Sequence, residues 1–386
     1  MTSRQPIPRG FWTVWTAVAV DLLGFGIIIP LLPLYAERFG ASAFTIGLLF
    51  ASYSLAQFVF SPVWGRISDR VGRRPILLVT IAGSAVGSLI LGLAGSLPML
   101  FVGRILDGAS GASVAVARAT VSDVAEASQR PRLMGLLGAA FGLGFVVGPS
   151  LGALAALGSP SLPFFVAAGI SALNFIAGVI RIPETLRQPA SPVSSAPVRS
   201  LPNPVLRIVA LTFVGITAFS AFEATFSLLG SARLAMTEST VALVFAGVGL
   251  VLVATQGGMV GPITRSLGES STIRLGLILN IAGFALLAVA DSWSLLVPGL
   301  VLLAVGQGLL TPTLSSTVAG LVPERAGVAL GVQQSAGGLA RVAGPALGGA
   351  LFAAAIPLPY VVAAGLTLVA LPIVPRTAAP VGTTSR

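Results

Sequence analysis

Long apolar runs separated by short polar stretches extend along the whole chain. About 20 apolar residues cross a bilayer as one helix, and these runs are continuous rather than alternating, which excludes a β-barrel. The first run is too long for a signal-peptide core and lacks a small-residue cleavage site, so we expect it to be retained. The predicted spans number twelve: residues 11–36, 44–64, 76–95, 98–121, 133–157, 162–181, 205–231, 240–262, 272–290, 294–320, 327–353 and 357–375.

Composition supports a membrane protein and narrows its chemistry. Of the 386 residues 55% are hydrophobic and 9% are charged, and the mean hydropathy of +0.97 is far above soluble usage. The chain has no cysteine and no histidine, so any proton that it transports must be bound by a carboxylate. The sequence contains no phosphate-binding Gly-Lys-Ser/Thr loop, metal cluster or nucleophile–base pair. We therefore expect neither an enzyme nor an ATP-driven pump, and no cofactor or metal.

The distribution of the basic residues indicates on which side of the membrane the loops and termini lie. The net charge of +10 comes from arginine alone, and most arginines lie between apolar runs, which disfavours a nucleic-acid binder. An even number of spans puts both termini on one side, and among the loop arginines only Arg38 and Arg233 fall on the other side. The positive-inside rule then predicts cytoplasmic termini for a multi-pass protein of the inner or plasma membrane.

The chain divides into two halves that resemble one another. Residues 182–204 are rich in proline and serine and are predicted to form a cytoplasmic linker between bundles 1–181 and 205–386. A shift of 196 residues matches Gly135, Gly148, Pro149 and Gly152 with Gly331, Gly344, Pro345 and Gly348, and Gly65 and Gly72 with Gly261 and Gly268. The predicted fold is all-α, with twelve transmembrane helices in two pseudo-symmetric bundles of six.

Four motifs carry a family resemblance. They are "GRISDRVGRRP" (65–75), "GRILDGASGA" (103–112), "GLLGAAFGLGFVVGPSLGA" (135–153) and "IPETL" (182–186). The chain resembles the major facilitator superfamily, and within it the twelve-span drug:proton antiporter branch that includes tetracycline exporters. The resemblance implies the major facilitator fold, alternating access, and a central cavity lined by spans one, four, seven and ten.

The first motif is predicted to form a cytoplasmic latch in the loop between spans two and three. The resemblance implies that Asp69 caps a helix start in the second half, near Gly327, and that Arg70 and Arg73 bind acids such as Asp123. The alternative is that the motif only fixes topology and a tight turn, with the turn permitted by glycine. The predicted latch comprises Gly65, Asp69, Arg70, Gly72, Arg73, Arg74 and Asp123.

The antiporter motif of span five places small residues at mostly four-residue spacing. Such spacing forms a groove that lets a neighbouring helix approach closely, and a proline bends the span. This surface suits helices that rock against each other, but a static packing face is an equal reading. The motif residues are Gly135, Gly144, Gly148, Pro149 and Gly152.

Charged residues inside the spans predict a proton site. An ionisable group at bilayer depth costs roughly 2.5 kcal/mol or more, so it usually faces a cavity or a partner. Asp21 lies near the middle of span one, and Arg104 and Asp107 lie one turn apart on span four. We expect Asp21 to carry the proton, and the resemblance implies that Arg104 is its charge partner. Asp107 replaces the more usual glutamine, which leaves open that it merely neutralises Arg104.

A substrate cavity is predicted in the second half. It comprises Phe222, Glu223, Phe226, Gln307 and Arg341. Phenylalanines with a carboxylate suit an amphiphilic or cationic drug, although lipid-facing packing is the more frequent cause of such phenylalanines and interhelical hydrogen bonding that of such glutamines. Arg341 is expected to meet either Glu223 or an anionic substrate.

The predicted function is export of a small organic solute, lipophilic and drug-like, in exchange for protons. The expected partners are that solute, protons and the lipid bilayer, and the protein is expected to be a monomer. One alternative is a proton-coupled importer or exporter of a sugar or other metabolite. Another is a transport-inactive membrane sensor or assembly partner. The lack of histidine departs from some tetracycline exporters and weakens that narrower assignment.

Overall fold

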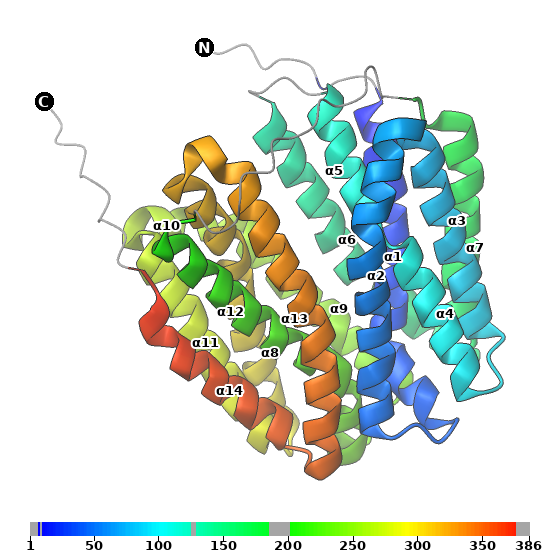
Figure 1. The fold of residues 1–386 in the computed structure, drawn as a ribbon. Helices are drawn as coiled ribbons and strands as arrows, with labels where there is room; N and C mark the ends of the chain where they lie inside the picture. The colour runs from blue at the N-terminus through cyan, green and yellow to red at the C-terminus, as the bar shows by residue number, and fades with distance from the viewer. Residues whose placement is uncertain (1–6, 8–9, 125–128, 185–200, 376–386) are drawn as a thin grey trace, which may run out of the picture. The chain divides into compact units, whose positions relative to one another are not determined.

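A computed structural model describes residue 7 and residues 10–124, 129–184 and 201–375 (Figure 1). The regular elements in these ranges are helices. They are α1 (Phe11–Glu37), α2 (Ala43–Val71), α3 (Arg73–Gly92), α4 (Leu97–Ser110), α5 (Ser113–Val124), α6 (Arg130–Ala156), α7 (Leu162–Arg181), α8 (Asn203–Leu234), α9 (Glu238–Ala254), the π-helical η2 (Thr255–Met259), α10 (Val260–Leu267), α11 (Glu269–Val289), α12 (Trp293–Leu321), η3 (Pro323–Arg325), α13 (Ala326–Ala354), α14 (Leu358–Ala370) and η4 (Leu371–Ile373).

The helices confirm the predicted all-α membrane fold. Ten helical stretches in the described ranges are long and apolar enough to cross a membrane. The other two predicted runs are also helical: α13 has 29 residues, and α14 has 13 residues followed by the short η4. Every predicted run therefore contains helix.

The chain forms two compact units. Unit 1 comprises Met1–Ser194 with Met236–Gly247, and unit 2 comprises Ser195–Ala235 with Val248–Arg386. In unit 1, α1 packs on α6 and α7, and α3 packs on α4 and α7. In unit 2, α8 packs on α13, and α11 packs on α12 and α14 (Figure 1). The predicted boundaries at residues 181 and 205 stay a prediction, and most of the linker lies outside the described residues.

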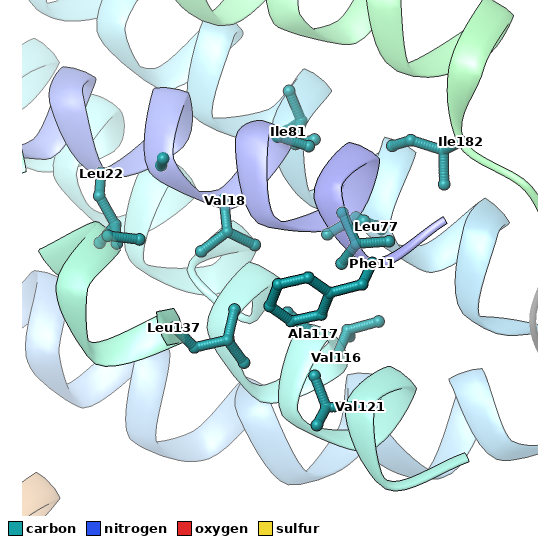
Figure 2. Close-up of a cluster of buried hydrophobic side chains, with 14 of the residues drawn as sticks. Phe11, Val18, Leu22, Leu77, Ile81, Val116, Ala117, Val121, Leu137 and Ile182 are labelled. Carbon is teal, nitrogen blue, oxygen red and sulfur yellow. The ribbon is translucent and has the colours of Figure 1, made fainter. Parts of the chain in front are cut away.

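Each unit has its own apolar core. Figure 2 shows the buried apolar side chains of unit 1, among them Phe11, Leu22, Ile81 and Leu137 from α1, α3 and α6. The core of unit 2 joins α8, α11, α12 and α13 through residues that include Val205, Ile208, Ile273, Leu277, Leu310 and Ala329. Burial of apolar side chains between helices fixes which face of each span turns inward, while the outer faces remain apolar for lipid.

The predicted loop between spans two and three is wrong, because helix occupies nearly all of it. The second helix continues to Val71, the third begins at Arg73, and only Gly72 separates them. Gly72 has φ 115°, in the left-handed region that favours glycine, whereas Gly65 lies inside α2 and makes no turn. Gly268 has φ 80° at the equivalent position of the second half. The turn chemistry of the repeat is thus kept although its charges are not.

Span four is interrupted, which the sequence analysis missed. Helix α4 ends at Ser110 and α5 begins at Ser113, within a run predicted to be one helix. Carbonyl groups next to the break accept hydrogen bonds from α2: Trp64 donates to the carbonyl of Ala109 at 2.6 Å, and Gln57 donates to that of Gly111 at 2.8 Å. Such side-chain donors are what permits a broken helix at membrane depth, where no water replaces the lost backbone bonds.

Substitution of the two glycines of the first motif should have opposite effects. Gly72→Ala should lower the free energy of unfolding by roughly 1–2 kcal/mol, because alanine is strained at positive φ. Gly65→Ala should be neutral or stabilise by up to about 1 kcal/mol, because Gly65 is helical and an added Cβ meets no atom within 4 Å. Thermal unfolding of the purified variants measures both effects. Equal melting temperatures for the two variants would contradict the assignment of the turn to Gly72.

Candidate functional site

A charged cluster lies inside unit 1, where α1 and α4 carry the predicted proton-site residues. Arg104 is 1% exposed, and its Nη1 lies 3.4 Å from Oδ2 of Asp107 one turn along α4. The guanidinium also lies over the ring of Tyr53, 4.1 Å from the ring centroid. An aromatic face and a carboxylate both stabilise a buried cation. Arg104 is therefore held in place by α2 and by its own helix.

Asp21 stands beside this ion pair with different partners. Its Oδ2 accepts a hydrogen bond of 2.5 Å from the hydroxyl of Ser113, and its Oδ1 is enclosed without a hydrogen-bond partner among the described residues. The carboxylates of Asp21 and Asp107 interact electrostatically. The cluster therefore holds one acid that no base directly neutralises.

The geometry differs from the predicted pairing. In the described part of the chain, Arg104 forms its ion pair with Asp107, whereas Asp21 is held by Ser113. The reading that Asp107 neutralises Arg104 thus has a contact to support it, and the role of each acid stays a prediction. Ser113 was missed because isolated serines in apolar spans are common interhelical hydrogen-bonding groups.

The predicted latch residues form a network around Arg73 at the start of α3. The side chain of Arg73 is 6% exposed and lies 2.6 Å from Asp69 and 2.8 Å from Asp123. Its Nη1 also donates to the hydroxyl of Ser68 at 2.6 Å. One buried guanidinium thus joins the end of α2 to α5. The predicted contact of Asp69 with the helix start near Gly327 would join the two units, and it stays a prediction.

Glu184 completes this network, although only its motif and not the residue was singled out. Its carboxylate accepts hydrogen bonds from the backbone N–H groups of Arg73 at 3.0 Å and Arg74 at 3.3 Å. A carboxylate in this position satisfies the unpaired donors of a helix start and complements its partial positive charge. Arg74 in turn donates to the carbonyl of Val179 at 2.6 Å. The end of span six is therefore tied to the start of span three.

The antiporter-motif glycines fall into two groups. Gly144, Gly148 and Gly152 face α1, and an added Cβ on Gly144 or Gly148 would meet α1 backbone atoms. An added Cβ on Gly135 meets nothing within 4 Å. Pro149 lies inside α6. Three of the four glycines thus permit close packing of α1 on α6, next to Asp21, while Gly135 has no such neighbour.

The predicted cavity residues of unit 2 differ in exposure. Phe222 and Phe226 are buried, 1% and 0% exposed, with ring centroids 5.3 Å apart. Glu223 is partly exposed and Arg341 is exposed, and the two interact electrostatically. Gln307 is buried between Asn280 and Thr311, with hydrogen-bond distances of 3.4 Å to each. The charged residues of this set are at least partly exposed, whereas Phe222, Phe226 and Gln307 are buried.

The chain is similar to known proteins over most of its length. A family model described as Major Facilitator Superfamily matches residues 14–258 and 209–385. The chain is 34% identical over 311 residues to the class B tetracycline resistance protein of Escherichia coli, covering 78% of this chain and 77% of the relative. It is 28% identical over 354 residues to multidrug resistance protein 1 of Bacillus subtilis (strain 168), covering 89% and 90%. The crystal structure of the human organic anion transporter MFSD10 (TETRAN) superimposes with a TM-score of 0.73 at 26% identity, covering 96% and 100%.

Substitution by alanine should destabilise the protein at a motif glycine that packs on α1 and should not do so at a motif glycine with open space around it. Gly148→Ala should lower the free energy of unfolding by roughly 1–3 kcal/mol, because the new methyl group meets the backbone of Leu23 and Gly26. Gly135→Ala, on the same helix, should be neutral or slightly stabilising, because alanine favours helix and the space is open. Melting temperatures of the purified variants measure the difference. A Gly148→Ala protein as stable as the Gly135→Ala protein would contradict the packing described for α1 and α6.

Proposed function

Because the chain belongs to the major facilitator superfamily, we propose that it is a secondary active transporter that exports a small organic solute in exchange for protons. The family and fold indicate a transporter and not an enzyme. The tetracycline and multidrug resistance proteins that it resembles favour a lipophilic, drug-like solute. Proton coupling requires a group that can gain and lose a proton within the membrane.

The observation that carries the proposal is the unneutralised acid of unit 1. Arg104 and Asp107 compensate each other, and Asp21 adds a second carboxylate, whose hydrogen bond among the described residues comes from the hydroxyl group of Ser113. Burial favours the protonated form of such an acid, and exposure to water favours the ionised form. Alternating exposure of Asp21 to the two sides of the membrane would therefore load and release a proton.

The solute is proposed to bind against the charged face of unit 2. Arg341 lies near the middle of α13 and is exposed, and Glu223 on α8 is partly exposed. A charge at this depth is tolerated where it faces water rather than lipid, so both residues support a hydrated cavity. Because Phe222, Phe226 and Gln307 are buried, they would support the wall of this cavity by packing behind it.

The remaining proposals concern topology and gating. The arginine distribution supports cytoplasmic termini in the inner or plasma membrane, with bundles 1–181 and 205–386 joined by a cytoplasmic linker at 182–204. The network around Arg73 supports a cytoplasmic latch in which Asp69 would exchange its partner during the cycle. A monomer would suffice for this mechanism, because each chain holds both bundles.

Transport by purified protein in liposomes tests the function. With an acidic interior, the unmodified protein should accumulate tetracycline with Mg²⁺, or ethidium, inside the liposomes, and a protonophore should abolish the accumulation. Asp21→Asn should reduce gradient-driven accumulation at least about 10-fold, because an amide cannot carry a proton. Asp69→Asn should slow turnover several-fold if the latch is functional.

The control and the outcomes separate the alternatives. Asp291→Asn removes an exposed acid between α11 and α12, and it should transport as the unmodified protein does. Accumulation only with an alkaline interior would indicate symport and contradict export by exchange. Gradient-driven accumulation that survives in Asp21→Asn would remove this residue from the carrier role. Absence of movement of both probes under either gradient would contradict a drug-like substrate.

A further inference from the structure

Two side chains on one face of α2 hold the break in span four. Gln57 donates to the carbonyl of Gly111 at 2.8 Å, and Trp64 donates to that of Ala109 at 2.6 Å. The two donors lie two turns apart, so they point to the same side of the helix. An added Cβ on Gly111 would meet the side-chain nitrogen of Gln57, which shows how closely α2 approaches. The position of the break is therefore set by α2 and not by the backbone of span four alone.

The helix that starts after this break binds the carboxylate of Asp21. Ser113 is the first residue of α5 and is 2% exposed, and its hydroxyl donates to Oδ2 of Asp21 at 2.5 Å. The other oxygen, Oδ1, is enclosed and has no hydrogen-bond partner among the described residues. A donor to a carboxylate favours its ionised form, and the unpaired N–H groups of a helix start favour negative charge nearby. The two oxygens of Asp21 thus have different surroundings.

The charged groups nearest to Asp21 come from α4, where Arg104 is paired with Asp107 and lies over the ring of Tyr53. On the helices that pack on α1, the other charged residues lie toward the predicted cytoplasmic ends. They are Arg66, Asp69 and Arg70 of α2, Arg73 and Arg74 of α3, Arg118 and Asp123 of α5, Arg130 and Arg132 of α6, and Arg181 of α7. In the part of the chain that the structure describes, a neutral hydroxyl rather than a cation therefore holds the carboxylate of Asp21.

We propose that Ser113 is a positioning residue for proton release from Asp21, and that Gln57 acts through it by holding the break in span four. A proton from water binds at Oδ1 while Oδ2 keeps the serine bond. Release returns the proton to water and leaves a carboxylate that the hydroxyl stabilises. A movement of α2 that withdraws Gln57 loosens the start of α5, so that Asp21 binds a proton more tightly. The inference rests on the proposed function and names residues that regulate its proton-binding site.

Infrared titration of the purified protein measures proton binding to Asp21 without transport. The carbonyl band of protonated carboxylic acids is followed with pH, and the part of the band that is absent in Asp21→Asn is assigned to Asp21. The test variants are Ser113→Ala, Gln57→Met and the double variant that carries both changes. Ser113→Thr keeps a hydroxyl group at the site and tests rescue.

Two control variants remove hydroxyl groups that bond within their own helices. Thr120→Val acts on α5, where the hydroxyl of Thr120 donates to the carbonyl of Val116 at 3.0 Å. Ser52→Ala acts on α2, where the hydroxyl of Ser52 donates to the carbonyl of Leu49 at 2.8 Å. Both controls should titrate as the unmodified protein does.

Ser113→Ala should shift the midpoint of the Asp21 band by about one unit toward higher pH, a roughly tenfold rise in proton affinity, because the ionised carboxylate loses its donor. Gln57→Met should shift the midpoint in the same direction by less, because Trp64 still holds the break. The double variant should match Ser113→Ala, since the effect of Gln57 passes through the serine. The midpoint of Ser113→Thr should lie closer to that of the unmodified protein than the midpoint of Ser113→Ala does.

Two results would overturn the inference. One is a Ser113→Ala protein whose Asp21 band has the midpoint of the unmodified protein. The other is a Gln57→Met protein whose midpoint is unshifted, or whose shift adds in full to that of Ser113→Ala, because Gln57 would then not act through Ser113. Gln57→Met alone decides the matter if Ser113→Ala does not fold.

The same variants distinguish this inference from the proposed function. Transport that persists in Asp21→Asn, together with the expected shift in Ser113→Ala, would count against the proposed function only. Loss of transport in Asp21→Asn without a shift in Ser113→Ala would count against this inference only.

Discussion

Ionised side chains and interrupted backbone need partners in an apolar medium, and this requirement organises unit 1. Arg104 is enclosed by Asp107 and Tyr53, and the break between α4 and α5 is stabilised by Gln57 and Trp64. Asp21 is fixed at that break by Ser113. Each polar group is thus supported by a side chain on another turn or helix. Asp21 differs in its charge: among the described residues of the cluster the base is Arg104, which is already paired with Asp107.

The two halves share backbone architecture but not chemistry. The turns at Gly72 and Gly268 both have positive φ, and the close packing of α1 on α6 through Gly148 has a counterpart in α8 on α13 through Gly344. The acids of the first half have no acidic counterparts: positions shifted by 196 residues from Asp21 and Asp107 hold threonine and leucine. This asymmetry supports assigning proton binding to the first half and leaves the second half to the solute.

The sequence predicted the helices well because continuous apolar runs of this length have few other structures available in a bilayer. It failed at two places. The break in span four depends on donors from another helix, α2, and the extension of α2 through Val71 depends on a single residue, Gly72, making the whole turn. The charged positions were found because charge is rare in such spans. The sequence did not predict how these residues pair, because Asp21 and Asp107 are equally suitable partners for Arg104 until the helices are packed.

The account depends on Asp21 meeting water during the cycle rather than lying permanently in lipid or sealed protein. Because the chain has no cysteine, single cysteines can be labelled without background. A cysteine in place of Asp21 should react with a small, water-soluble, charged thiol reagent, and a cysteine in place of Leu173, an exposed apolar residue of α7, should not. Reaction at position 21, and none at position 173, is the result predicted. A cysteine at position 21 that stays unreactive in a folded protein would contradict access of water to this position.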